Sequence, residues 1–154
     1  MRLFRIALAQ FSRSRKQAFS GEGGLHASAR WHTAGRPIVY TSQSLSLAAL
    51  EILVHLKQTD DLRPFCAFTL EVPDDLILKP AAWPAAWRTK IRASRAFGDR
   101  WIEGRASPAL LVPSAVSPDE WNVLLNPRHP RFSFGWVVKG PVAYRFDSRL
   151  VDRR

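Results

Sequence analysis

Apolar and polar residues alternate in short runs along much of the chain, a pattern typical of β-strands. Residues 3–9 predict a first strand, and the β-branched run at 38–40 predicts a second one after a turn at Gly35-Arg36-Pro37. Further strands are predicted at residues 65–72, 76–78, 109–113, 122–126, 132–138 and 142–146, with Gly140-Pro141 as the turn between the last two. Strands therefore dominate the predicted structure.

One helix stands out from this pattern. Residues 45–57 are apolar on most sides, which predicts a largely buried helix that Ser42 or Ser44 caps and that Asp60, Asp61 and Pro64 close. Weaker helical patterns cover 89–101, where Gly98 is unfavourable, and 11–20 and 80–87, each of which indicates a short helix or a loop. No repeat or domain linker interrupts residues 1–154. We therefore expect a single α+β domain rather than a regular βαβ array.

Composition narrows the class of protein. With 154 residues, 46% of them hydrophobic, the chain can form a core and is not of the disordered type. No apolar run approaches the roughly eighteen residues of a membrane span, and the first residues do not form a secretory signal. The single cysteine, Cys66, excludes an internal disulfide and a CxxC zinc site. These features predict a cytoplasmic protein without a membrane association.

The charge indicates an anionic partner without choosing one. A net charge of +10 suits a nucleic acid, a phosphorylated metabolite or an acidic protein. The basic residues are spread along the chain, and no RRM, zinc-finger or KH signature accompanies them.

Glu51 is the most informative polar residue, because it lies within the apolar helix and a buried carboxylate is costly without partners. His55, one helical turn later, or an arginine from another segment would share its charge. One interpretation is a structural ion pair. The other is a carboxylate that faces a developing cation or a sugar hydroxyl. Helical spacing does not separate the two.

Other polar residues have both structural and functional interpretations. Arg30 is either a surface residue or a bidentate ligand of a pyrophosphate. Tyr40 is either a core aromatic or a residue that stacks on a planar ligand. Ser114 lacks the GxSxG context of a hydrolase nucleophile, but its hydroxyl can bond a ligand or cap a turn. The glycines at 21–24 favour a plain turn, Asn122, Asn126 and His129 favour bonding to the backbone, and no residue pattern indicates a metal site.

Taken together, the order of these segments resembles the RES-domain family, toxins of bacterial type II toxin–antitoxin pairs named after their Arg, Glu and Ser residues. The resemblance covers nearly the whole chain. The matching segments, in order, are Phe4-Arg5-Ile6, Arg30-Trp31 with 35–42, the Glu51 helix at 47–55, Gly98-Asp99-Arg100-Trp101, Val112-Pro113-Ser114-Ala115, 122–127 and 146–150.

The resemblance implies a fold similar to ADP-ribosyltransferase toxins, with NAD as a substrate and no cofactor or metal. Family members split the nicotinamide–ribose bond with water or phosphate as acceptor, or pass ADP-ribose to a protein. It implies catalytic roles for Arg30, Tyr40 and Glu51, and NAD contacts for Arg30, Tyr40 and Ser114. It also implies an Xre-type antitoxin as partner, in a joint oligomer, and no direct binding of nucleic acid by this chain.

The chain departs from the family pattern at one place. Ser28 and Ala29 stand where many members have two glycines, and His32 stands where asparagine is common. The backbone approaches a ligand less closely without those glycines, which gives Arg30 more of the expected binding.

The chemistry itself suits these residues, because cleavage of NAD passes through an oxocarbenium-like sugar and needs a nearby negative charge more than a strong acid. An alternative function, argued from charge alone, is a basic nucleic-acid-binding or ribonuclease toxin module.

Overall fold

The computed structural model describes residues 1–56 and 63–151. Seven strands form one sheet: β1 (Arg2–Leu8), β2 (Val39–Ser42), β3 (Phe65–Glu71), β4 (Ile77–Leu78), β5 (Ala109–Pro113), β6 (Trp121–Leu125) and β7 (Val137–Tyr144). The α-helices are α1 (Arg15–Ala18), α2 (Gly23–His26), α3 (Leu45–Leu53), α4 (Ile91–Gly104) and α5 (Ser148–Val151). Short 3-10 helices are η1 (Ala9–Phe11), η3 (Asp74–Leu76) and η4 (Phe134–Trp136). The predicted α+β class with a mainly antiparallel sheet is confirmed.

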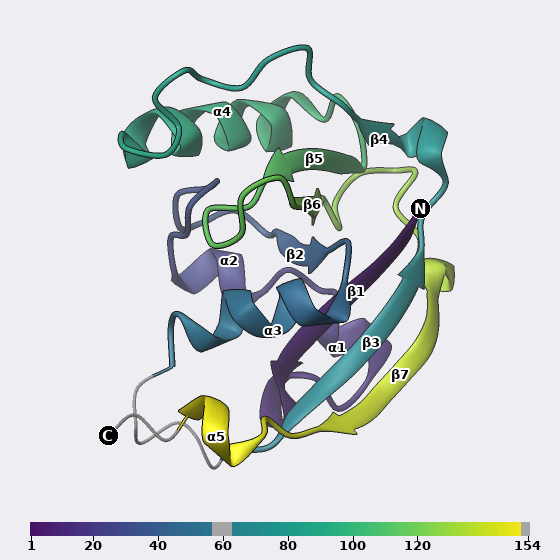
Figure 1. Ribbon diagram of the computed structural model, residues 1–154. Coiled ribbons are helices and arrows are strands. Elements are labelled where there is room, and N and C mark those ends of the chain that lie inside the picture. The colour runs from purple at the N-terminus through teal and green to yellow at the C-terminus, as the bar shows by residue number, and fades with distance from the viewer. Residues whose placement is uncertain (57–62, 152–154) are drawn as a thin grey trace.

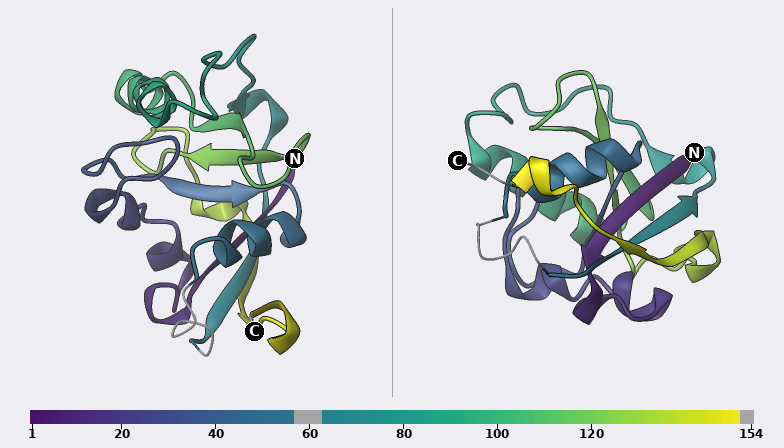
Figure 2. Two further views of the ribbon diagram at one scale, coloured as in Figure 1. Left: turned by 60° about the vertical axis from the view of Figure 1, so that its left-hand side comes forward. Right: turned by 60° about the horizontal axis from the view of Figure 1, so that its bottom comes forward.

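The sheet has the strand order β4-β5-β6-β2-β1-β3-β7, and only β4 and β5 are parallel. It is split in the middle. β1 pairs with β3 along its whole length, from Arg2↔Glu71 to Leu8↔Phe65, but its registered pairing with β2 is limited to Phe4↔Ser42. β1, β3 and β7 therefore run at a steep angle to β2, β5 and β6 (Figures 1 and 2). The two halves of the sheet diverge from the Phe4–Ser42 pair.

Separate apolar clusters hold the helices to the two halves. The helix α4 lies over β5 and β6, where its Trp101 and Ile102 join Leu110, Leu124 and Trp31 (Figure 1). The helix α3 packs on β1, with Ala48 and Ala49 against Ile6 and Phe65. A third cluster fills the space around β1, β3 and β7 and includes Leu3, Phe19, Phe68, Leu70 and Val137. None of the helices in the described residues is long and apolar enough to span a membrane.

The predicted burial of the Glu51 helix is wrong. Only Leu47, Ala48 and Ala49 of α3 are buried, while Leu50 and Val54 are 41% and 51% exposed. The reason is that one stripe of the helix faces β1 and nothing in the described residues covers its outer side. Ser44 is the cap, since its Oγ accepts the N–H of Leu47 at 3.0 Å. The helix ends at Leu53, and the predicted end at Lys57 and the closing residues Asp60 and Asp61 lie outside the described residues.

The predicted turn at Gly140-Pro141 is also wrong. These residues lie inside β7, which pairs with β3 on both sides of them through Lys139↔Thr69 and Val142↔Ala67 with a register shift. Gly140 has a positive φ of 111° and joins Pro141 through a cis peptide bond. A Cβ there would lie 2.6 Å from the ring of Phe68, so only glycine fits this irregularity. The residues expected to start the strand form η4 instead.

Gly98, the expected weak point of its helix, is a packing contact. A Cβ at this position would lie 1.8 Å from the carbonyl oxygen of Trp31, so the missing side chain lets the 27–36 segment rest directly on α4. The glycine therefore costs some helix propensity and allows a close approach of two backbones.

We expect Gly98→Ala to lower the free energy of unfolding by at least about 2 kcal/mol, because a backbone oxygen cannot rotate away from the added methyl group. A Cβ added at Gly104, in the same helix, would meet nothing within 4 Å. Gly104→Ala is the matched control and should stabilise by up to about 1 kcal/mol through helix propensity. Urea denaturation of the three proteins measures both effects, and equal stabilities would contradict the proposed contact.

Candidate active site

A cavity of about 690 Å³ opens where β1 and β2 diverge. β1 contributes Arg5 and Ile6 to its wall, β2 contributes Tyr40, and α3 contributes Glu51, with His55 just beyond the helix end. The remaining wall comes largely from the segment between Gln17 and His32. The split in the sheet thus creates the space, and residues from distant parts of the sequence meet in it.

Glu51 lies at this cavity with its carboxylate held by neutral donors. Its Oε1 accepts hydrogen bonds from Ser114 Oγ at 2.8 Å and from Asn122 Nδ2 at 2.5 Å. Ser42 in turn donates to Asn122 Oδ1 at 2.7 Å, which orients the amide. Within residues 1–56 and 63–151, no ion pair of Glu51 with His55 or an arginine is present. The interpretation as a structural ion pair is therefore not supported, because only neutral donors hold the carboxylate.

Ser114 acts through Glu51 in this structure. Ser114 directly follows the end of β5. It is 1% exposed and does not line the cavity. Its hydroxyl accepts the N–H groups of Val116 and Ser117, both at 3.0 Å, and donates its own proton to the carboxylate. Asn122, for which bonding to the backbone was expected, is the second partner of Glu51. Both residues orient the acid, since each is fixed by bonds of its own.

Tyr40 lines the cavity from β2 and takes part in a chain of hydrogen bonds. Its hydroxyl accepts the N–H of Trp31 at 3.2 Å and lies 2.9 Å from Nδ1 of His32. Burial raises the pKa of the Tyr40 phenol well above its usual value of 10.0, so the hydroxyl keeps its proton at neutral pH. The ring of Tyr40 is thus a fixed, neutral part of the cavity wall.

Arg30 does not line the cavity. Its Nη1 donates to the main-chain carbonyls of Trp87 at 3.4 Å and Arg88 at 3.0 Å, in the segment that precedes α4. The structure therefore brings Glu51 and Tyr40 together and directs Arg30 elsewhere, and its expected role in NAD binding stays a prediction.

Arg5 is a cation of the cavity wall that sequence reasoning missed. Its Nη1 donates to the carbonyl of Tyr40 at 3.0 Å, and its guanidinium lies 5.8 Å from the centre of the Phe19 ring. Its Nε is buried without a hydrogen-bond partner in the described structure, and no described carboxylate pairs with it. Burial lowers the pKa of Arg5 to about 10, which leaves it charged at neutral pH.

A signal for Arg5 was present in the sequence. Side chains of a strand alternate between two faces, so Arg5 shares the face of Leu3, which is fully buried. A cation at an inward position of a strand needs an acidic partner or a ligand.

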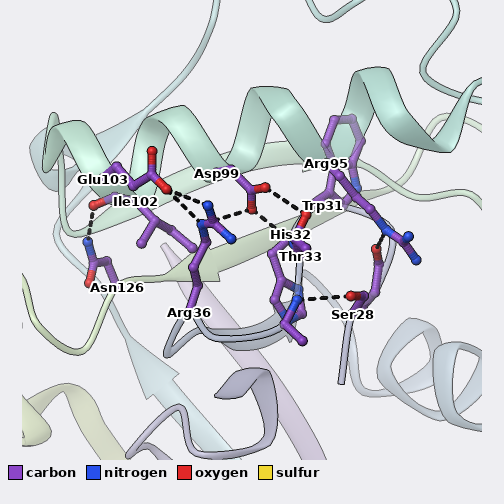
Figure 3. Close-up of polar contacts among 12 residues, drawn as sticks. Ser28, Trp31, His32, Thr33, Arg36, Arg95, Asp99, Ile102, Glu103 and Asn126 are labelled. Atoms are coloured by element: carbon purple, nitrogen blue, oxygen red, sulfur yellow. Dashed lines mark hydrogen bonds and ion pairs between the residues drawn. The ribbon is translucent and has the colours of Figure 1, made fainter. Parts of the chain in front are cut away.

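The helix α4 holds the segment that carries Trp31 and His32 (Figure 3). Asp99 accepts the N–H and the hydroxyl of Thr33 at 2.9 and 2.8 Å, and Arg95 donates to the carbonyl of Ala29 at 2.9 Å. Arg36 bonds Glu103 of the same helix and forms an ion pair with Asp99 at 3.3 Å. The wall of the cavity behind Tyr40 is therefore fastened to α4. In the part of the chain that is described, no group of His, Cys, Asp and Glu side chains is arranged to hold a metal ion.

Relatives with known names match most of this chain. The chain is 36% identical to the protein named Toxin Res from Yersinia enterocolitica, over 97% of this chain and 99% of that protein. It is likewise 36% identical to the Prs ADP-ribosylating toxin of a Sphingobium strain, over 87% of each chain.

A solved structure gives the fold independently. A chain of the M. tuberculosis MbcT–MbcA toxin–antitoxin complex superposes with a TM-score of 0.72 at 17% identity, covering 94% of this chain and 84% of that one. This match shows that the chain shares the fold of that protein. Since the model of the RES domain matches residues 2–147, nearly the entire chain, the protein belongs to the RES-domain family.

Proposed function

We propose that this protein is the toxin of a toxin–antitoxin pair and that it consumes NAD by cleaving the bond between nicotinamide and ribose. One observation carries the proposal: the same cavity is lined by a buried cation without a described acidic partner, Arg5, and by a carboxylate, Glu51, that only neutral groups hold. NAD offers a partner to each, because its pyrophosphate is anionic and its ribose becomes cationic during cleavage. The name of one relative, Toxin Res, supports the role as a toxin, and the name of another, Prs ADP-ribosylating toxin, supports the reaction class.

Glu51 stabilises the reacting sugar in this proposal. Nicotinamide leaves as a neutral group, so the step needs no strong acid, and positive charge develops on the ribose as the bond breaks. A carboxylate aimed at that charge lowers the barrier if it does not reorganise during the step. The bonds from Ser114 and Asn122 hold one oxygen of Glu51 and leave the other for a ribose hydroxyl or the cation.

Arg5 binds the pyrophosphate in this proposal. Arg5 lines the cavity and no described carboxylate pairs with it, and a phosphate is the ligand class that a guanidinium fork pairs best. Tyr40, whose carbonyl accepts from Arg5, offers its ring as a surface for the nicotinamide or the ribose. The acceptor of the ADP-ribose group is water, phosphate or a protein side chain, since all three share this first step.

We expect Glu51→Gln to lower kcat for nicotinamide release by about a hundredfold or more, because the amide carries no negative charge. The fold should persist, since Oε1 of glutamine accepts the same two hydrogen bonds. The assay follows free nicotinamide from NAD, with circular dichroism as the check on folding. Glu71→Gln is the control, because Glu71 pairs with Arg2 on the exposed surface. Equal turnover by Glu51→Gln and the parent protein would remove Glu51 from the mechanism.

A binding titration distinguishes Arg5 from Arg30 as the residue that binds the pyrophosphate. We expect Arg5→Ala to raise the Kd for NAD by about tenfold to a hundredfold, the value of a charge-assisted hydrogen bond. Arg30→Ala should change the Kd less, because its guanidinium is bound to main-chain carbonyls. The sequence-based prediction gives the opposite order. Calorimetric titration of the Glu51→Gln background with NAD avoids turnover, and a larger loss in Arg30→Ala would return the pyrophosphate to Arg30.

We further propose that the partner is an antitoxin of the Xre type, which forms an oligomer with this chain. The solved structural relative comes from a toxin–antitoxin complex, and the net charge of +10 suits an acidic protein segment. The protein purified together with an Xre-type antitoxin that binds it should release nicotinamide more slowly than the protein alone. An equal rate would contradict the pairing.

A further inference from the structure

His32 connects two fixed points of the cavity wall. Its ring is almost fully buried, at 2% exposure, with Nε2 at 2.9 Å from the carbonyl oxygen of Ala27 and Nδ1 at 2.9 Å from the hydroxyl of Tyr40. A carbonyl only accepts, so Nε2 carries the proton. In the neutral ring, Nδ1 then accepts the O–H of Tyr40, and the phenol oxygen accepts the N–H of Trp31. Each atom of this chain has a single role, which sets the direction of the Tyr40 hydroxyl.

The backbone that carries His32 is fixed by hydrogen bonds of its own. The N–H of Ala29 donates to the carbonyl of His32 at 3.1 Å, and Arg95 holds the carbonyl of Ala29. Asp99 holds Thr33, the next residue, through two hydrogen bonds (Figure 3). On the other side, Tyr40 belongs to β2 and pairs with Leu124 of β6. The imidazole of His32 therefore links the segment held by α4 to β2, through the hydroxyl of Tyr40.

We propose that His32 is a positioning residue: its neutral ring holds the hydroxyl and ring of Tyr40 against the cavity, and protonation of His32 releases that hold. The inference rests on the proposed function, since the effect on turnover assumes that Tyr40 contacts the substrate. It adds to the site a residue to which sequence reasoning assigned no role, and with it an acid-sensitive element.

Protonation conflicts with the hydrogen-bond chain. A charged ring carries a proton on both nitrogens, so Nδ1 would donate to the Tyr40 oxygen that already accepts from Trp31. The hydroxyl proton would then need a different acceptor, and the O–H bond would have to rotate away from His32. The orientation found here therefore belongs to neutral His32.

The surroundings favour the neutral form. The charged groups that face His32 are Asp99 and Arg95 of α4, and the same two groups and Glu51 act on Tyr40. Burial lowers the pKa of His32 below its ordinary value of 6.5, and the Ala27 carbonyl and Asp99 oppose this shift only in part. The unfolded chain then binds a proton more readily than the folded one. Stability from the neutral ring is therefore present above pH 6.5 and is lost as the pH falls from 6.5 toward the lower folded pKa.

Two substitutions test the role. Asparagine offers one acceptor and one donor group like neutral histidine but does not titrate, whereas alanine offers neither. At pH 8 we expect His32→Asn to keep kcat within about threefold and His32→Ala to lose about tenfold to a hundredfold, as expected for a displaced group in the site. We expect an acid limb in the kcat of the parent, and we expect this limb and the part of the stability loss below pH 6.5 that His32 causes to be absent in His32→Asn. His129→Asn, in a turn outside this chain of hydrogen bonds, is the control and should keep the parent profile.

A double variant tests whether His32 acts through Tyr40. If it does, His32→Ala adds little to the loss in kcat caused by Tyr40→Phe, because the hydroxyl that His32 holds is already missing. Additive losses would overturn the proposal. So would equal losses in His32→Asn and His32→Ala, or an unchanged kcat in His32→Ala.

A readout independent of NAD separates this inference from the proposed function. Nitrogen NMR of the histidine rings should show His32 as the tautomer protonated at Nε2, with signals that shift in Tyr40→Phe. If the parent releases no nicotinamide, the proposed function fails while this measurement still decides the contact. A ring that titrates at the ordinary value, or signals indifferent to Tyr40→Phe, would overturn the positioning role.

Discussion

The site depends on one interaction across the split in the sheet. β1 and β2 share a registered pair at Phe4 and Ser42 and then separate, and the guanidinium of Arg5 spans the opening to reach the carbonyl of Tyr40. A side chain thus joins two strands at a level where backbone pairing has ended, and the cavity lies beside it. The arrangement has an electrostatic cost, because a cation is removed from water without an acidic partner in the described structure. A bound anion would supply the partner that the fold leaves out, which links the architecture to the class of ligand.

Glu51, another residue of the cavity wall, differs from Arg5 because its carboxylate has hydrogen-bond partners. Glu51 is satisfied, but by Ser114 and Asn122 rather than by a cation. Neutral donors orient an acid without cancelling its charge, and this leaves its field available to a substrate. The two donors lie at the end of β5 and in β6, and the acid belongs to α3, so the acid is oriented only when the helix rests on the sheet. The packing of α3 on the sheet therefore both stabilises the fold and orients the carboxylate of Glu51.

The helix α4 serves the site from a distance. Its residues Arg95, Asp99 and Glu103 bind the backbone or side chains of the 27–36 segment, and Gly98 lets that segment approach to contact distance. Trp31 and His32 are carried by this segment and meet the hydroxyl of Tyr40. Ser28 adds a contact within the same segment. Ser28 Oγ accepts the N–H of Ala34 and so closes the segment on itself.

The sequence by itself determined most of the strands, the α+β class and the family, and it narrowed the helix cap to Ser42 or Ser44, because alternation and capping are local and the motif order is read directly along the chain. It also selected Glu51 and Tyr40, each conspicuous in its own segment. What only the tertiary structure decided is how the segments meet. The bonds of Arg30 to the carbonyls before α4, the bond of Arg5 to the Tyr40 carbonyl, the pairing of Glu51 with Asn122 and the continuity of β7 through Pro141 all depend on contacts between residues distant in sequence. Local patterns carry no information about such contacts, since a side chain's partner is set by where the sheet splits and which face a helix covers.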